Sequence, residues 1–238
     1  MNKIFVSNKK IKPFNKIIRV PGDKSISIRF VLFASQAKGV SKAYNLLMSE
    51  DVIAALEAIK KLGIKVLIKK QYCEVFGKGL NSFRYKNNLV INAKNSGTLG
   101  RLILGLLIKS PKKIKLIGDK SLSKRDFSRV TKPLKKFGAR FSYNIKDKLP
   151  LSIIGSENSR GINYIENKGS AQCKTSVMLA ALNSTGTTRI KAKKSRNHSE
   201  LLFKYLKVPI KIKKTKKYDL INIIKPKKIN AFNYNIPG

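Results

Sequence analysis

The chain has 238 residues, of which 42% are apolar, and its 52 Lys and Arg residues against 12 Asp and Glu give a formal net charge of +40. This apolar content is enough for one substantial core or two small ones, which excludes general disorder. No apolar run reaches the roughly 18 residues of a membrane helix, and the basic start of the chain lacks the apolar stretch and cleavage site of a signal peptide. We therefore expect a cytoplasmic protein without a membrane partner.

The same short pattern opens three successive parts of the chain, at residues 17–37, 89–108 and 162–182. Each copy begins with a strand-like apolar run, continues with a few Gly, Ser or Asn residues that include a Ser and a basic residue, and ends in an apolar helix. The Ser residues of the copies are about 70 to 75 positions apart, and such self-similarity indicates repeated structural units.

The remainder of each unit repeats as well. A short strand, a second helix with apolar residues three or four positions apart, and a hairpin follow each apolar helix. The expected short strands lie at residues 40–47, 112–118 and 186–192, and the hairpins at residues 64–76, 139–155 and 208–224. Gly63 and Gly138 end two of the second helices, because Gly takes the left-handed cap conformation without steric cost. The predicted fold is α/β (α+β), with three β-α-β-α-β-β units around a helical core.

The charge of +40 would by itself suggest nucleic acid, since Lys and Arg neutralise phosphates. However, the lysines are scattered over every unit, the chain has no Trp, and its aromatic residues do not alternate with basic ones as a stacking platform requires. Abundant Lys, Asn and Ile with few Arg indicate the coding bias of an AT-rich genome. We expect no specific nucleic-acid partner.

The two cysteines are isolated. Cys73 falls in an expected hairpin strand and Cys173 in the first turn of an expected helix. Neither has the spacing of a metal site or of a disulfide framework, so we expect no metal and two reduced thiols in the interior.

The three repeated turns favour a pocket for an anionic small molecule. A helix N-terminus presents unpaired backbone N–H groups and the positive end of the helix dipole, and here each turn adds hydroxyl, amide or cationic groups. These groups come from Lys24, Ser25 and Arg29 in the first turn; from Asn95, Ser96, Gly97, Thr98 and Arg101 in the second; and from Ser170, Gln172 and Lys174 in the third. Lys24 and Ser25 are expected to precede their helix. The alternative is that these turns only cap their helices, because Ser, Asn and Thr at helix starts are usually caps.

The motifs PGDKSISIR, NSGTLGR, GDKSLSKR, GSAQCK and KSRNH occur in this order. Together they closely resemble the N-terminal half of the 5-enolpyruvylshikimate-3-phosphate synthase family, also called 3-phosphoshikimate 1-carboxyvinyltransferases, from about Arg19 to Gly238. The resemblance implies the enolpyruvyl transferase fold, shikimate 3-phosphate and phosphoenolpyruvate as partners, no metal or other cofactor, and a monomer for full-length members. It also implies transfer of the enolpyruvyl group to the 5-hydroxyl of shikimate 3-phosphate with release of phosphate, in the pathway to chorismate and the aromatic amino acids.

The resemblance further implies roles for single residues. Lys24 would lie between the two substrates, and Arg29 would hold the carboxylate of shikimate 3-phosphate. Gly97, through its backbone N–H, and Arg125, through a bidentate contact, would bind phosphoenolpyruvate. The implied substrate-binding residues are Lys24, Ser25, Arg29, Asn95, Gly97, Arg125, Ser170, Ala171, Gln172, Ser195 and Arg196.

Some positions depart from the family pattern. Ile28 stands where the family often has His, and Asp126 and Phe127 follow Arg125 in place of the usual Pro and an apolar residue. Asp126 beside Arg125 would weaken phosphate affinity. His198, the only histidine, is expected to be a cap-region residue rather than a general base.

The resemblance implies that the groups that move protons come from the C-terminal half, which we expect to be missing here. Glu50, Asp51 and Glu200 have the positions of helix-start acids, so no residue of this chain is assigned a catalytic role.

We accordingly expect an incomplete sequence. Residues 1–20 would form an N-terminal strand segment that belongs with an absent second domain, residues 21–232 a three-unit domain that binds shikimate 3-phosphate, and residues 233–238 the start of a crossover. Such a chain would bind shikimate 3-phosphate weakly and turn over negligibly. The alternative is a shortened paralogue that binds another phosphorylated metabolite or RNA without catalysis.

Overall fold

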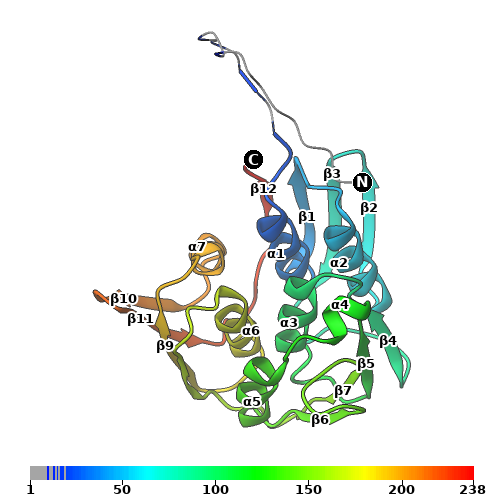
Figure 1. Cartoon of the computed structure of the whole chain (residues 1–238), viewed down its shortest axis with the longest axis vertical. Coiled ribbons are helices and arrows are strands. Elements are labelled where there is room, and N and C mark those ends of the chain that lie inside the picture. Colours follow the sequence, from blue (N-terminus) through cyan, green and yellow to red (C-terminus); the bar gives the residue numbers. More distant parts are fainter. Residues whose placement is uncertain (1–9, 11–12, 14, 16, 19) are drawn as a thin grey trace.

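Three four-stranded sheets surround a group of central helices (Figure 1). The computed structural model describes residues 10, 13, 15, 17–18 and 20–238. In Figure 1 the sheets of the first and second units lie at the right and the sheet of the third unit at the lower left, with helices between them. The predicted α/β fold with three units around a helical core is confirmed.

The units place their helices and strands in nearly the same order. The first unit contains α1 (Lys24–Ala34), β1 (Lys38–Tyr44), α2 (Glu50–Lys61), β2 (Lys65–Lys69) and β3 (Tyr72–Lys78). The second contains β4 (Leu89–Asn92), α3 (Gly97–Leu106), β5 (Ile114–Ile117), α4 (Lys120–Ser123), α5 (Ser128–Lys136), β6 (Arg140–Tyr143) and β7 (Leu151–Ile154). The third contains β8 (Asn163–Glu166), α6 (Ala171–Ala181), β9 (Thr187–Lys193), α7 (His198–Tyr205), β10 (Ile210–Lys214) and β11 (Tyr218–Ile224), and β12 (Asn233–Asn235) follows.

The core helices α1, α3 and α6 are buried over most of their residues, because other elements cover them. Gly105 of α3 allows α6 to approach closely, since a Cβ added there would lie 2.1 Å from the carbonyl oxygen of Ser176. Gly63 and Gly138 follow α2 and α5 with φ of 85° and 97°, as predicted. Within the described residues, no helix combines the length and the apolar character needed to cross a membrane.

The three sheets share one strand order. It is β12-β1-β3-β2 in the first, β4-β5-β7-β6 in the second and β8-β9-β11-β10 in the third. The first two strands of each order are parallel and the other neighbours are antiparallel. β12 therefore occupies in the first sheet the position that β4 and β8 occupy in the others.

This position corrects one expectation about the first unit. The apolar run at residues 17–20 was expected to supply the first strand, but Ile17, Ile18 and Val20 lie outside any strand, and Ile17 is 96% exposed. Arg19 and most of residues 1–20 lie outside the described residues, so the proposed N-terminal strand segment is not described.

The C-terminal segment takes the strand position because apolar contacts anchor both of its ends. β12 pairs with β1 from Lys42↔Asn233 to Tyr44↔Asn235. Before β12, the ring of Phe232 lies 5.3 Å from that of Phe30 on α1, and after β12 the side chain of Ile236 is buried. Asn233–Asn235, which we expected to begin a crossover, thus belong to the first sheet.

Both cysteines are buried and unpaired, in agreement with the expectation of interior thiols. Burial raises the pKa of the Cys73 thiol to about 12, so this thiol stays protonated at neutral pH.

Candidate functional site

The central helices α1, α3 and α6 begin at the same end of the domain. Arg29 in the second turn of α1 lies 3.2 Å (Nη2 to Oγ1) from Thr175 of α6, and Arg101 in α3 lies 2.9 Å (Nη1 to Oε1) from Gln172 in the first turn of α6. Because these contacts join the first turns of α6 to the early turns of α1 and α3, the N-termini of the three helices lie close together. Three sets of unpaired backbone N–H groups and positive dipole ends therefore face one region.

The capping contacts of these helices show which hydroxyls of the repeated turns are helix caps and which are left for a ligand. Ser96 and Ser170 cap α3 and α6 through hydrogen bonds of 3.2 Å, so the capping interpretation is correct for both hydroxyls. Asp23 caps α1 at 2.7 Å. Lys24 and Ser25 are the first two residues of α1 and do not precede it, which leaves the half-buried Ser25 hydroxyl outside the cap.

Two guanidinium groups converge on the start of α3. A Cβ added to Gly97 would lie 2.9 Å from Nη1 of both Arg101 and Arg125. The Arg101 guanidinium also lies 5.3 Å from the centre of the Phe127 ring. Burial lowers the pKa of Arg101, and the charges of Arg125 and Arg129 add to the effect. Cations brought together in this way are stabilised by an anion placed between them.

Gln172 joins the second turn to the third. Its Oε1 accepts a hydrogen bond from Arg101, and its Nε2 donates one of 2.9 Å to Thr98 Oγ1. Ala171, the first residue of α6, lies half-buried beside it. The side chain of Gln172 is thus fixed between two helix starts.

A buried acid fixes the loop that leads into α6. The Glu166 carboxylate accepts the Ser170 N–H at 2.8 Å and an Arg129 N–H at 2.7 Å. Ser170 is therefore held by its backbone as well as by its capping hydroxyl.

Arg29 lies almost entirely inside the protein, with 3% of its surface exposed. Its guanidinium donates to the Ser25 carbonyl at 2.9 Å, to Ser199 Oγ at 2.8 Å and to Thr175 Oγ1 at 3.2 Å. Burial lowers the pKa of Arg29 to about 10, against the opposing effect of the Glu200 carboxylate. The group remains a cation at neutral pH.

Two other expected ligand groups are held by carboxylates. Lys24 Nζ lies 2.7 Å from Asp51, and Asn95 Nδ2 donates to Asp119 at 2.5 Å. The Leu122 backbone N–H and then the Asn95 amide lower the pKa of Asp119. A ligand would have to compete with Asp51 for Lys24 and with Asp119 for Asn95.

The segment between β9 and α7 contributes unpartnered polar atoms. Ser195 Oγ and His198 Nδ1 are buried and have no hydrogen-bond partner among the described residues, whereas Arg196 is exposed. His198 is the first residue of α7, next to the N-cap residue Asn197, and its expected lack of a general-base role stays a prediction. Burial and the neighbouring charge of Arg29 lower the pKa of His198, so its imidazole is neutral at pH 7.

Lys174 does not supply a donor to this region as expected. Its ammonium is fully buried and lies 2.5 Å from the carboxylate of Glu200, which is itself only 5% exposed. The cause is the cover on every side of α6, which leaves Lys174 no route to solvent. Glu200 lies in the first turn of α7 as expected, but it faces the interior.

The residues that depart from the family pattern leave the helix starts intact. Ile28 and Phe127 are fully buried. Asp126 accepts hydrogen bonds from the N–H and the hydroxyl of Ser128 at 2.7 and 2.8 Å. Burial acts to raise the pKa of Asp126, but these two bonds together with nearby cations outweigh it, and the pKa is lowered. The effect of Asp126 on phosphate affinity stays a prediction.

Sequence reasoning missed the buried hydroxyls of Thr175 and Ser199 and the anchoring roles of Glu166 and Arg129. No local pattern marked them, because the contacts of Thr175 and Ser199 with Arg29, and of Arg129 with Glu166, join residues distant in the sequence. Arg101 was marked by its spacing from Gly97, but its contact with the third turn was not.

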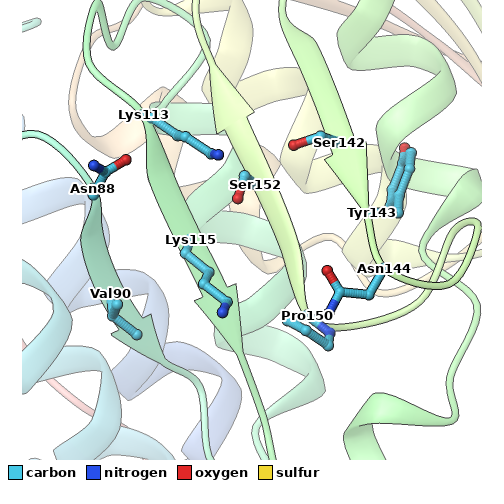
Figure 2. A pocket seen from close by; sticks show the side chains of 9 residues that line it. All are labelled: Asn88, Val90, Lys113, Lys115, Ser142, Tyr143, Asn144, Pro150 and Ser152. Atoms are coloured by element: carbon cyan, nitrogen blue, oxygen red, sulfur yellow. The ribbon is translucent and has the colours of Figure 1, made fainter.

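One of the cavities lies away from the helix starts, on the outer face of the second sheet. The cavity has a volume of about 440 Å³. Figure 2 shows Lys115 of β5 and Lys113, which directly precedes β5, beside Ser152 of β7. Their neighbours Ile114 and Leu116 are buried on the opposite face. Exposed lysines occur over the whole surface, so these two do not distinguish a site.

The groups at the helix starts are cations, amides, hydroxyls and backbone N–H groups. Such a set suits an anionic, hydroxylated ligand. In the part of the chain that the structure covers, no three His, Cys, Asp or Glu side chains gather in a way that could hold a metal ion.

Comparison with known proteins agrees with this geometry. The family model of EPSP synthase (3-phosphoshikimate 1-carboxyvinyltransferase) matches residues 8–238. The 3-phosphoshikimate 1-carboxyvinyltransferases of Streptococcus pyogenes serotypes M1 and M49 (strain NZ131) are each 35% identical over 228 residues, which cover 95% of this chain and 52% of the relative. A solved EPSP synthase from Acinetobacter baumannii has a TM-score of 0.84 and 30% identity over 92% of this chain and 49% of its own. The chain spans about half the length of the curated relatives it matches, and it belongs to the EPSP synthase family.

Proposed function

We propose that this chain supplies the shikimate 3-phosphate site, and part of the phosphoenolpyruvate site, of an enzyme that transfers the enolpyruvyl group of phosphoenolpyruvate to the 5-hydroxyl of shikimate 3-phosphate. The observation that best supports this proposal is the convergence of Arg101 and Arg125 on Gly97 at a helix start. Two anionic substrates that react with each other need fixed cations, because their charges otherwise drive them apart.

The proposed ligand contacts follow the three helix starts. Shikimate 3-phosphate would place its carboxylate at Arg29 and its phosphate at Ser170, Gln172 and the unpartnered hydroxyl of Ser195. Ala171, Ser25 and the exposed Arg196 would complete this subsite, the last as a neighbour rather than a direct ligand. The ligand would therefore span the first and third units.

Phosphoenolpyruvate would lie at the start of α3. The Gly97 N–H and the Arg125 guanidinium would bind it, with Lys24 between the two substrates and Asn95 at the margin. In the reaction the oxygen of the 5-hydroxyl adds to C2 of phosphoenolpyruvate and loses its proton, and C3 is protonated to a methyl group. Elimination then removes phosphate from C2 and a proton from C3. Fixed cations stabilise the leaving phosphate dianion.

The groups that transfer protons are proposed to come from outside these residues. Several acids near the helix starts already have partners: Asp23 accepts from the Ile26 N–H, Asp51 pairs with Lys24, Asp119 accepts from Asn95, and Asp126 accepts from Ser128. We therefore expect the 238-residue chain to bind shikimate 3-phosphate but to release negligible phosphate from the substrate pair.

Calorimetric titration of the purified chain with shikimate 3-phosphate tests the proposal. Gln172→Ala should weaken binding about three- to tenfold, the worth of one or two hydrogen bonds. Gln71→Ala, which removes the same side chain from the exposed β2–β3 turn, is the matched control and should bind like the wild type.

The outcome that contradicts the proposal is equally concrete. If shikimate 3-phosphate gives no heat and no thermal stabilisation, while an RNA oligonucleotide binds at physiological salt, the chain is an RNA-binding relative without this ligand. Phosphate release by the isolated chain at an enzyme-like rate would instead contradict the external source of the proton-transferring groups.

A further inference from the structure

A chain of buried hydrogen bonds runs from Arg29 to the first turn of α6. Arg29 Nε donates to Ser199 Oγ at 2.8 Å, Ser199 Oγ lies 2.7 Å from Thr175 Oγ1, and Thr175 Oγ1 donates to the Ala171 carbonyl at 2.7 Å. Arg29, Ser199 and Thr175 are all at most 3% exposed. These residues come from α1, α7 and α6, so the chain joins the first unit to the third.

The chemistry of the hydroxyls fixes the direction of this chain. A hydroxyl has one hydrogen, and that of Thr175 is used by the Ala171 carbonyl. Ser199 must then be the donor to Thr175, and its oxygen accepts from Arg29. The donors therefore run in one order, from Arg29 through Ser199 and Thr175 to Ala171, and a reversed arrangement would leave the Ala171 carbonyl without this donor.

Within the part of the chain that the structure describes, the same contacts leave two N–H groups of the Arg29 guanidinium without a partner. Arginine has five N–H donors. Nε and Nη2 of Arg29 face Ser199 and Thr175, and Nη1 donates to the Ser25 carbonyl. Each terminal nitrogen keeps one N–H without a partner among the described residues, and a pair of this kind binds a carboxylate in bidentate fashion.

We propose that Ser199 and Thr175 are positioning residues, which hold the Arg29 guanidinium so that its two free N–H groups face the carboxylate of the ligand. This inference rests on the proposed function, because that function places a carboxylate at Arg29. The two hydroxyls are buried and bonded to Arg29, so their loss should act through the contact of Arg29 with the ligand carboxylate.

Substitutions that remove each hydroxyl test the role. Ser199→Ala and Thr175→Val should each weaken shikimate 3-phosphate and shikimate binding about tenfold or more, whereas inorganic phosphate should bind within about twofold of the wild type. Ser199→Thr keeps the hydroxyl and should restore binding. Ser184→Ala and Thr188→Val are matched controls, because their buried hydroxyls have no partner among the described residues.

Titration calorimetry gives the affinities for shikimate 3-phosphate and shikimate, and competition gives that for inorganic phosphate. Thermal unfolding of every variant verifies the fold; if Thr175→Val does not fold, the Ser199→Ala and Ser199→Thr pair decides. Equal weakening for shikimate and inorganic phosphate, or none for either, overturns the positioning role while leaving the proposed function standing. Failure of the wild type to bind shikimate 3-phosphate overturns the proposed function, and the positioning role with it.

Discussion

Replacement of Glu200 by Gln should destabilise the domain strongly, because it leaves the Lys174 ammonium buried without a counter-charge. Lys174 is fully buried, the two charged atoms lie 2.5 Å apart, and apart from this ion pair the ammonium has no partner in the described part of the chain. Removal of one member of a buried ion pair costs about 3–5 kcal/mol. For a chain of this length about 1 kcal/mol shifts the unfolding midpoint by about 2–4 °C, so we expect a fall of about 6–20 °C.

The matched control is an exposed ion pair. Lys94 and Glu57 lie 3.9 Å apart with their side chains 42% and 51% exposed. Glu57→Gln should therefore cost less than about 1 kcal/mol. Urea unfolding followed by circular dichroism, with thermal melts in parallel, measures both losses.

A double substitution separates the charge effect from packing. Lys174→Met with Glu200→Leu removes both charges, and the double variant should recover most of the stability that either single substitution loses. The reasoning is refuted if Glu200→Gln unfolds within about 1 kcal/mol of the wild type, or if the two single losses simply add in the double variant.

Three further predictions concern the helix starts and the core. Gly97→Ala should lower the unfolding midpoint by no more than a few degrees, because the close contacts of its Cβ, at 2.9 Å, are with side-chain nitrogens and not with backbone: those of Arg125, which is exposed, and of Arg101, which Gln172 holds. In the presence of shikimate 3-phosphate it should weaken phosphoenolpyruvate binding about tenfold, as titration would measure. The pKa of His198 is lower in the folded chain than in the unfolded one, so the unfolded chain binds a proton first as pH falls below about 6.5. Protonation therefore reduces the free energy of unfolding in this pH window. Urea titrations should show this loss in the wild type and not in His198→Gln. Cys73, with a pKa of about 12 and no exposed surface, should react with a thiol reagent at pH 8 only after urea unfolds the domain, and fast labelling in native buffer would contradict its burial.

The repeated architecture could be predicted from the sequence because its signals are local. The period of the turns, the apolar spacing of the helices and the stops at Gly63 and Gly138 each depend on neighbouring residues, and all three hairpins lie where they were predicted. The first strand of the first unit could not be predicted in this way. Residues 17–20 are more strand-like than Asn233–Asn235, but the contacts of Phe232 and Ile236 with the core decide which segment pairs with β1.

In the candidate site, too, local signals could be predicted from the sequence and contacts between distant elements could not. Spacing alone marked Lys24, Arg29 and Gln172 as residues of helix starts. It could not reveal that Lys174 turns away toward Glu200, because the covering of α6 on all sides is a property of the assembled domain. A lysine in a turn that faces solvent and a lysine in a turn that faces another helix have the same sequence neighbours.

Binding to the many exposed lysines and binding at the candidate site differ in how the cations are held in place. Most lysines are exposed and would bind any polyanion with an affinity that falls steeply with salt. Arg29 and Arg101 differ, since each is largely buried and is fixed by hydrogen bonds that it donates to elements far away in the chain. Groups that are fixed before a ligand arrives lose little freedom on binding and are screened less than exposed ones. Affinity for shikimate 3-phosphate should therefore fall much less between 50 and 200 mM salt than affinity for RNA, and equal salt slopes for the two ligands would mean that the helix starts act only as part of a general basic surface.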